Sequence, residues 1–277
     1  MKQKLFVSFS SGRTSAFMAK KLKDEYSDQF EMVFGFANTG QEDEKSLVFA
    51  DRCDREWGLN LVWIEAVVHQ GRVGCTHKIV SFEAAARNGQ PFEEVIKKYG
   101  IPNKAYPHCT RELKLNPIQS YMNSIGWGSA QKAVGIRVDE PKRIRKNAAE
   151  EGLIYPLVTM FPTTKPEILD WWKEQPFDLG LLDHQGNCTW CWKKSLKKHV
   201  MLYHENPDIY RFPASMEEMY GLAGHNIDGT KRTFFRENRS TQDIISIAQL
   251  LNPPRPQDQE EDAGCSESCE VFGDISL

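Results

Sequence analysis

Several features are missing from this sequence of 277 residues. No apolar run approaches the roughly 18 residues that a membrane helix needs. The first residues, MKQKLFVSFSSG, lack the long apolar segment and the small-residue cleavage site of a signal peptide. A formal net charge of -3 argues against a general electrostatic attraction to nucleic acid, although it does not exclude a local basic face. We therefore expect a cytoplasmic protein without a membrane partner.

An even, regularly spaced set of cysteines is also absent. The seven cysteines are an odd number and are spread unevenly, so they do not indicate a disulfide framework. In a reducing compartment such cysteines are more often buried, metal-bound or redox-active. No GK[ST] sequence is present either, which excludes a Walker A phosphate loop.

Apolar runs and helical patterns alternate along the first half of the chain. The apolar runs at 4–8, 31–36, 59–64 and 130–136 read as strands, and 154–158 as a fifth, short element. Segments with helical periodicity separate them. This alternation predicts an α/β fold with a parallel sheet flanked by helices, in which ligands bind at the carboxyl ends of the strands.

We divide the sequence into three parts. Residues 1–185 form a nucleotide-binding α/β domain, with an insertion at about 66–107 that contains one clear helix. Residues 186–250 form a cysteine clip and a small helical part. Residues 251–277 are Pro-rich and then acidic, which is typical of a mobile tail.

The turn FSSGRTS, which follows the first apolar run, has the features of an anion site. Backbone N–H groups and the dipole at a helix start favour negative charge. Gly12 permits close backbone approach, and Arg13 can add a charge-assisted contact to phosphate or sulfate. The alternative is that the hydroxyl groups only cap the helix, although they are more numerous than one cap needs. The hydroxyl residues are Ser8, Ser10, Ser11, Thr14 and Ser15.

This loop, SFSSGRTS, resembles the SGGxDS loop of the adenine-nucleotide alpha-hydrolase (PP-loop) superfamily, and most closely its phosphoadenosine phosphosulfate reductase-like members. Further similar blocks follow in the expected order: ANTG at 37–40, CTRELK at 109–114, VGIRVDE at 134–140 and GNCTWC at 186–191. The resemblance covers about residues 4–194. It implies a Rossmann-like sheet and an adenine nucleotide or sulfonucleotide as substrate. The further nucleotide-binding residues that we expect are Asn38, Thr39, Gly40, Gly135 and Arg137.

Two positions depart from the family loop. Ser11 replaces the first glycine, and Thr14 replaces the acidic residue that is associated with magnesium-bound triphosphate in pyrophosphatase members. These departures weaken the ATP-cleaving hypothesis and favour a sulfonucleotide. For Arg137 the alternative to a ligand contact is an ion pair with Asp139 or Glu140. Lys114 is a further candidate to face the anion.

Cys188-x-x-Cys191 is a two-ligand clip of the kind that holds zinc or iron–sulfur clusters. The resemblance places Cys109 near it, as in sulfonucleotide reductases with a [4Fe-4S] cluster, although His108 stands where those enzymes have a second cysteine. A cluster is our preferred interpretation, with zinc or unmetallated thiols as alternatives, because soft thiolates suit either metal. Cys53 and Cys75 read as ordinary thiols.

Cys265 and Cys269 lie in the acidic tail. The resemblance implies that one of them is the catalytic nucleophile, because phosphoadenosine phosphosulfate reductases present a cysteine from a flexible C-terminal segment. Such a thiolate attacks the sulfur of the sulfonucleotide. The alternatives are two exposed thiols without a catalytic role, or a fourth ligand for the cluster.

Three functions are therefore open. The first is a sulfonucleotide reductase-like oxidoreductase with a thiol reductant protein as a partner. The second is an ATP-dependent sulfur transferase acting on tRNA or DNA, for which the basic stretch 193–199 and the nearby Trp190 and Trp192 could bind the nucleic acid. That stretch can equally be the solvated face of a helix. The third is a nucleotide-binding module without catalysis.

Overall fold

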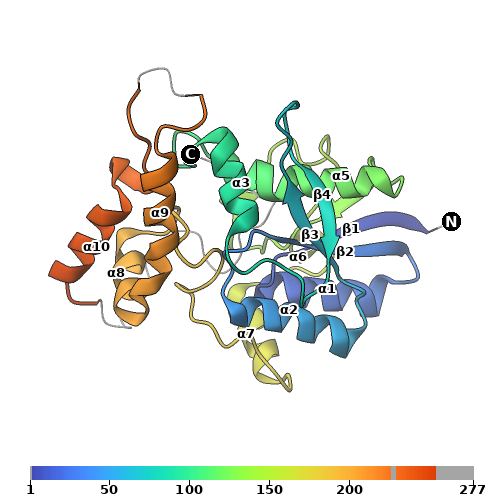
Figure 1. Ribbon diagram of the computed structural model, residues 1–277. Helices are drawn as coiled ribbons and strands as arrows, with labels where there is room; N and C mark the ends of the chain where they lie inside the picture. Colours follow the sequence, from blue (N-terminus) through green and yellow to red (C-terminus); the bar gives the residue numbers. More distant parts are fainter. Residues whose placement is uncertain (1, 226–228, 254–277) are drawn as a thin grey trace.

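The computed structural model describes residues 2–225 and 229–253, and its centre is a six-stranded sheet (Figure 1). The strands are β1 (Gln3–Phe9), β2 (Phe30–Asn38), β3 (Val62–Val67), β4 (Thr76–Val80), β5 (Gln131–Ala133) and β6 (Leu153–Ile154). Their order in the sheet is β4-β3-β2-β1-β5-β6, and all neighbours are parallel except β3 and β4. The predicted α/β class with a mostly parallel sheet is confirmed.

Strand β1 lies at the centre because it is apolar on both of its faces. Leu5 and Val7 pack on one side of the sheet and Phe6 on the other, as expected for a parallel strand covered by two layers. β1 pairs with β2 on one side and with β5 on the other. The strands that follow β1 in the chain therefore extend the sheet first to one side of β1 and then to the other. Such a reversal opens a crevice at the carboxyl ends of β1 and β5.

Three helices cover one face of the sheet: α1 (Arg13–Tyr26), α2 (Glu44–Trp57) and α7 (Lys165–Lys173). On the opposite face lies α5 (Asn116–Ser124), whose Ile118 and Met122 pack with Phe6. Helix α3 (Gln90–Tyr99) flanks the sheet beside the C-terminal helices. Within the two described stretches, no helix combines the length and the apolar character that crossing a membrane requires.

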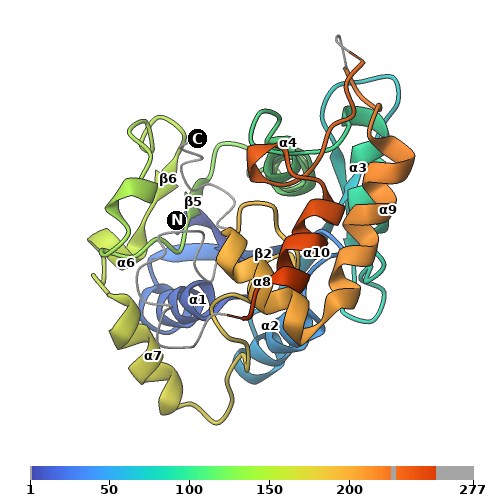
Figure 2. The same ribbon diagram turned by 90° about the vertical axis from the view of Figure 1, so that its left-hand side faces the viewer.

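The small helical part expected after residue 186 consists of α8 (Leu196–Glu205), α9 (Arg211–Tyr220) and α10 (Thr241–Leu250). These helices lie on the side where the parallel strands end, and the view in Figure 2 shows α8 and α10 in front of the sheet. The C-terminal part therefore borders the crevice. Shorter elements are α4 (His108–Thr110), α6 (Pro156–Thr159), and η1 (Arg111–Leu115), η2 (Pro141–Arg143), η3 (Pro207–Tyr210) and η4 (Arg236–Asn238).

Three details of the predicted elements were wrong. The insertion 66–107 contains a strand, β4, which reads as a loop in the sequence because it is a polar edge strand, antiparallel to β3. β5 ends at Ala133, because the chain turns tightly at Gly135, where Ile136 N–H bonds to Val134 O at 2.9 Å. The segment expected at 154–158 is mostly helix α6, which begins at Pro156, a residue suited to a first helical position.

Candidate functional site

The loop between β1 and α1 is held together by its own hydroxyl groups. Ser15 Oγ accepts from Ser10 N–H at 3.0 Å and donates to Gly12 O at 3.0 Å. Ser11 lies in the left-handed region, with φ 57°. The N-cap residue of α1 is Gly12, which has no side chain with which to cap the first turn. The hydroxyls therefore shape the loop instead of capping the helix, and the N-terminus of α1 keeps its capacity for an anion.

Two buried side chains add to this end of the crevice. Ser8, the penultimate residue of β1, is buried, and its Oγ has no hydrogen-bond partner among the described residues. Thr14 Oγ1 accepts from Arg137 Nη1 at 3.1 Å. The loop after β5 thus brings a guanidinium to the first turn of α1. We call this set, Ser8 to Ser15 with Arg137, the anion end of the crevice.

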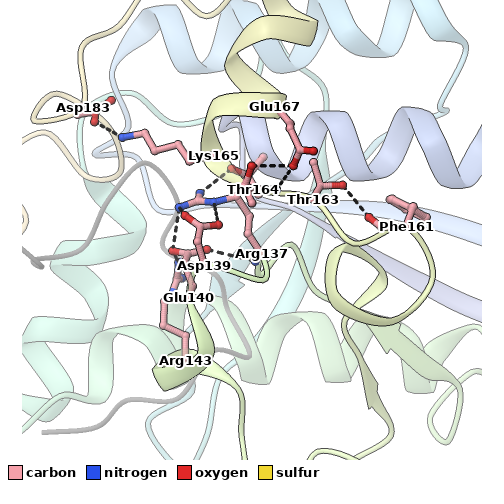
Figure 3. A network of polar contacts seen from close by, with 11 residues as sticks. Arg137, Asp139, Glu140, Arg143, Phe161, Thr163, Thr164, Lys165, Glu167 and Asp183 are labelled. Atoms are coloured by element: carbon pink, nitrogen blue, oxygen red, sulfur yellow. Dashed lines mark hydrogen bonds and ion pairs between the residues drawn. The ribbon is translucent and has the colours of Figure 1, made fainter.

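Arg137 itself is almost fully buried, with its side chain 3% exposed. Its Nε donates to Asp139 Oδ1 at 3.0 Å, and its Nη2 lies 3.5 Å from Glu140 Oε1. Figure 3 shows this pair of carboxylates around the guanidinium, with Arg143 on the far side of Glu140. Both sequence interpretations of Arg137 are therefore compatible with its position, since it forms the ion pairs and also reaches α1.

The side chain of Arg13 bonds to the segment that follows α7. Its Nε and Nη2 bond to the two carboxylate oxygens of Asp178 at 2.7 and 2.6 Å, and its Nη1 bonds to Leu181 O at 3.1 Å. This bidentate pair fixes α1 to the segment that follows α7. The predicted contact of Arg13 with phosphate would require the pair to open, so it stays a prediction that the geometry does not support.

The loop after β2 is shaped by Asn38 and Gly40. Asn38 is buried, and its Nδ2 donates to Glu65 Oε1 at 2.7 Å while its Oδ1 accepts from Gly40 N–H at 3.2 Å. Gly40 has φ 79°, and a Cβ there would lie 3.1 Å from the backbone of Gly89. These two residues hold the loop in place, as the turn at Gly135 does for the loop after β5. Their direct contact with a nucleotide stays a prediction.

Thr39, in the same loop, faces the cysteines. Its Oγ1 donates to Glu42 Oε1 at 2.8 Å and lies 3.5 Å from Cys188 Sγ. Thr189 N–H also bonds to Gln41 O at 3.0 Å, so backbone joins the loop to the cysteine clip. Sequence reasoning missed Glu42, whose only signal is its position three residues after Thr39 in a turn.

Three cysteines line one pocket: Cys188 and Cys191 of the clip, and Cys109, which is distant from them in sequence. Cys191 N–H bonds to Cys188 O at 3.0 Å, which closes the clip into a turn. We call the pocket that these three cysteines line the thiol pocket. Its other lining residues are Thr39, Phe92, Thr110, Leu113, Lys114, Asn187, Trp190, Trp192 and Lys193.

A π-helical turn, η1, begins two residues after Cys109. Asn116 N–H bonds to Arg111 O, five residues back, which is the π repeat. In an α-helix, residues five apart point about 140° away from each other. The π turn instead lets Cys109 and Lys114 line the same pocket. Single π turns are frequent at functional sites, and the sequence gives no sign of this one.

The thiol pocket is a poor environment for a bare thiolate. Burial raises the pKa of Cys188 well above its usual value, the Glu42 carboxylate acts in the same direction, and Lys114 opposes them. The five described cysteines are thiols, and Cys53 and Cys75 are buried, as expected for ordinary thiols. Burial raises the pKa of Cys75 to about 12. The Cys188 thiol is therefore protonated at neutral pH, and a metal that binds it must displace this proton.

A single metal ion and an iron–sulfur cluster make different demands on the positions of the thiols. A zinc ion needs its sulfur ligands to converge at about 2.3 Å from one point. Within the described stretches, no group of three His, Cys, Asp or Glu residues is placed to hold one metal ion. In a cluster each cysteine binds a different iron, so the thiols surround a volume. Three thiols line this pocket, and a cluster there stays a prediction; Cys265 and Cys269 lie outside the described residues.

The two tryptophans of the clip belong to the core. Trp190 is 1% exposed and packs against Phe92, Phe212 and Phe234. Trp192 is 4% exposed. Neither ring is available to stack on a nucleic-acid base in this conformation, so the expectation that they help to grip nucleic acid was wrong. The lysine-rich stretch at 193–198 lies partly at the surface beside the thiol pocket.

Comparison with known proteins gives relatives from a phage and an archaeon. The uncharacterized nin region protein ORF290 of Escherichia phage lambda is 30% identical over 280 residues, which cover 96% of this chain and 94% of that protein. Two uncharacterized proteins of Methanocaldococcus jannaschii are 25% and 24% identical over 67% and 53% of this chain, which spans only 34% and 27% of their lengths. No family model and no solved structure matches.

Proposed function

We propose that this chain, which belongs to the family of the phage lambda nin region protein ORF290, is a sulfonucleotide reductase-like enzyme of the PP-loop type. It binds an adenine sulfonucleotide in the crevice at the carboxyl ends of β1, β2 and β5. The phosphate groups bind at the anion end, and the sulfur end of the substrate points to the thiol pocket. The proposal rests on the local geometry and on the sequence resemblance.

One observation carries it: the loop after β2 belongs to both ends of the crevice. Asn38 fixes this loop to Glu65 of β3, and Thr39 Oγ1 lies 3.5 Å from Cys188 Sγ. β2 is the neighbour of β1 in the sheet, so its carboxyl end lies next to the loop of Ser8 to Ser15. A ligand that spans from the N-terminus of α1 to this loop therefore reaches the thiol pocket.

Each residue has a role that follows from its contacts. The N–H groups at the start of α1 and the guanidinium of Arg137 bind the anionic group, and Ser8 Oγ offers a further hydrogen bond. Cys109, Cys188 and Cys191 hold the metal centre. An iron–sulfur cluster, when bound, supplies a redox-active iron centre beside the substrate's sulfur.

The reductive step needs a thiolate as well. Attack on the sulfonate sulfur forms an S–S bond while the bond from sulfur to the phosphate oxygen breaks, and the released nucleotide keeps the electron pair. Cys265 and Cys269 are the candidates for this thiolate from the sequence. A thiol reductant protein then releases the sulfur from the enzyme.

Substitution of Gly12 tests the anion end. Gly12 has φ -106° and ψ 160°, a conformation open to any residue, so aspartate can take its place as the N-cap of α1. Its carboxylate would occupy the position of the ligand's charge. We expect Gly12→Asp to weaken binding of adenosine phosphosulfate by about 100-fold, since charge-assisted bonds contribute about 1.5–3 kcal/mol each. Isothermal titration calorimetry measures this.

Gly12→Asn is the matched control, because asparagine caps the helix equally well without the charge. It should weaken binding much less than Gly12→Asp, and neither variant should lower the thermal unfolding temperature. Equal affinity of the wild type and Gly12→Asp would place the nucleotide elsewhere. Binding of ATP only, with consumption of ATP when tRNA or DNA is added, would favour the sulfur-transfer function.

A further inference from the structure

The two tryptophans of the thiol pocket differ in the hydrogen bonding of their indole N–H groups. Trp190 Nε1–H donates to Gln41 Oε1. Trp192 is 4% exposed, and its Nε1 is buried without a hydrogen-bond partner among the described residues. Both rings line the pocket that contains the three cysteines. The chain thus satisfies one indole N–H of the pair and leaves the other without an acceptor.

A buried indole N–H without an acceptor is unusual. Tryptophan N–H groups find a partner when they are buried, and an exception calls for an explanation such as a bound group. Trp192 follows Cys191 directly, so its position is fixed by the same turn that positions the thiols. Lys193 Nζ also lies 5.5 Å from the centre of the Trp192 ring. A cation over the ring draws electron density from it and makes the N–H a stronger donor.

We propose that Trp192 Nε1–H donates a hydrogen bond to a sulfur atom of the group that Cys109, Cys188 and Cys191 hold. This inference rests on the proposed function of the pocket. It makes Trp192 a positioning residue for that group, and Trp190 a residue of the core. The distinction comes from the partner of each N–H, since both side chains are large, buried and adjacent to the same thiols.

The consequence is electrostatic. A donor directed at a sulfur stabilises the reduced, more negative state of a cluster more than the oxidised state, and such hydrogen bonds are among the factors that set its reduction potential. Removal of the Trp192 N–H should therefore make the centre harder to reduce. Removal of the Trp190 N–H should not, because that proton is directed at Gln41.

The test compares Trp192→Phe with Trp190→Phe in the full chain, purified without oxygen. The readout is a potentiometric titration of the iron–sulfur absorption. We expect Trp192→Phe to shift the midpoint to a more negative potential, equivalent to about a tenfold lower reduced-to-oxidised ratio at a fixed potential, as for the loss of one hydrogen bond to a charged acceptor. Trp190→Phe should leave the midpoint at the wild-type value.

A second readout does not depend on either variant folding well. In wild-type protein labelled with ¹⁵N-indole, the Trp192 N–H resonance should move downfield when the metal-free chain is loaded with iron and sulfide, while the Trp190 resonance stays. An unchanged midpoint in Trp192→Phe together with an unmoved Trp192 resonance would overturn the inference. A wild-type chain that binds no iron under these conditions would overturn both the inference and the proposed metal centre, whereas loss of the nucleotide site alone would leave the inference standing.

Discussion

The two ends of the crevice differ in the chemical character of the groups that line them. At the anion end, hydroxyls, a glycine N-cap and the buried Arg137 surround the start of α1. At the thiol end, aromatic rings and thiols form the wall, and burial raises the pKa of Cys188. One end presents helix N–H groups and a guanidinium, and at the other the raised pKa of Cys188 keeps this thiol protonated at neutral pH. A ligand that spans both ends would place an anionic group at one end and its sulfur beside the thiols at the other, which is why we propose a sulfonucleotide.

The helix starts around the crevice show the same contrast. The N-cap of helix α7 is Thr164, whose backbone N–H and hydroxyl both donate to Glu167, at 2.7 and 2.6 Å (Figure 3). The N-cap of helix α2 is Asp43, whose carboxylate accepts from Lys45 N–H at 2.8 Å. These ends are closed by their own side chains. The start of α1 has a glycine N-cap and is contacted instead by Arg137 from the loop after β5, which is why we propose that it receives the ligand.

Of the predictions that follow, Arg137→Met should have the largest effect, and that effect should be confined to the anion end. The guanidinium is buried and donates to Thr14, so its loss should weaken nucleotide binding by about 10- to 100-fold, the range for one charged hydrogen bond. Calorimetry with adenosine phosphosulfate measures the change. The amount of iron that the chain binds should stay the same, because Arg137 lies outside the lining of the thiol pocket.

Arg143→Met is the matched control. Arg143 pairs with the same carboxylate, Glu140, and is one residue of the network in Figure 3. It should change nucleotide affinity by less than about threefold, since exposed or half-exposed ion pairs contribute little. If both variants lose affinity equally, the carboxylates and not the guanidinium determine binding, and the assignment of Arg137 fails.

Lowering the pH should distinguish the two ends by a smaller effect, which is a loss of folding stability at the thiol end. The thiol end borders α8, where burial, followed by Lys194 and Arg236, lowers the pKa of His199 to about 3. In the unfolded chain this histidine takes up a proton near pH 6.5. Stability from the neutral imidazole is therefore complete above pH 6.5 and is lost as the pH falls towards 3, by about 2–3 kcal/mol at pH 4.5.

Amide hydrogen exchange of α8 and α10 at pH 7 and pH 4.5 measures this loss. His199→Asn keeps a polar atom near the Nδ1 position that contacts Tyr210 at 2.9 Å, and it cannot take up the proton. It should reduce the pH dependence without removing it, because burial also lowers the pKa of His108, to about 4. His225→Asn, at an exposed position, is the control. An unchanged slope in His199→Asn would show that α8 does not set the acid limit.

The sequence predicted the anion end better than the thiol end. The strand β1 is a continuous apolar run that ends in hydroxyls, and both properties are local, so the strand and its loop could be located. The roles of Arg13 and Asn38 depend on Asp178 and Glu65, distant carboxylates that no local pattern indicates. Charge alone suggested a ligand for Arg13, and the structure gives it an ion pair.

At the thiol end, Cys109 could be joined to the clip only through the family resemblance, because spacing along the chain carries no such information. The π turn that places it depends on backbone hydrogen bonding. The burial of Trp190 could not be predicted from the sequence either, because its aromatic partners come from α3, α9 and the segment before α10. Proximity to lysines in sequence suggested a nucleic-acid surface, whereas packing puts the ring in the core.

The central claim is that the anion end and the thiol end are one site. Alkylation of the metal-free chain with N-ethylmaleimide, followed by mass spectrometry, tests it most directly, because Cys109, Cys188 and Cys191 are all partly accessible. Adenosine phosphosulfate at a concentration that just saturates the wild type should slow modification of at least two of these cysteines by about tenfold, and the same concentration should have little effect in Gly12→Asp, which binds about 100-fold more weakly. Nucleotide that binds in the calorimeter but leaves the alkylation rates of all three cysteines unchanged would contradict the account.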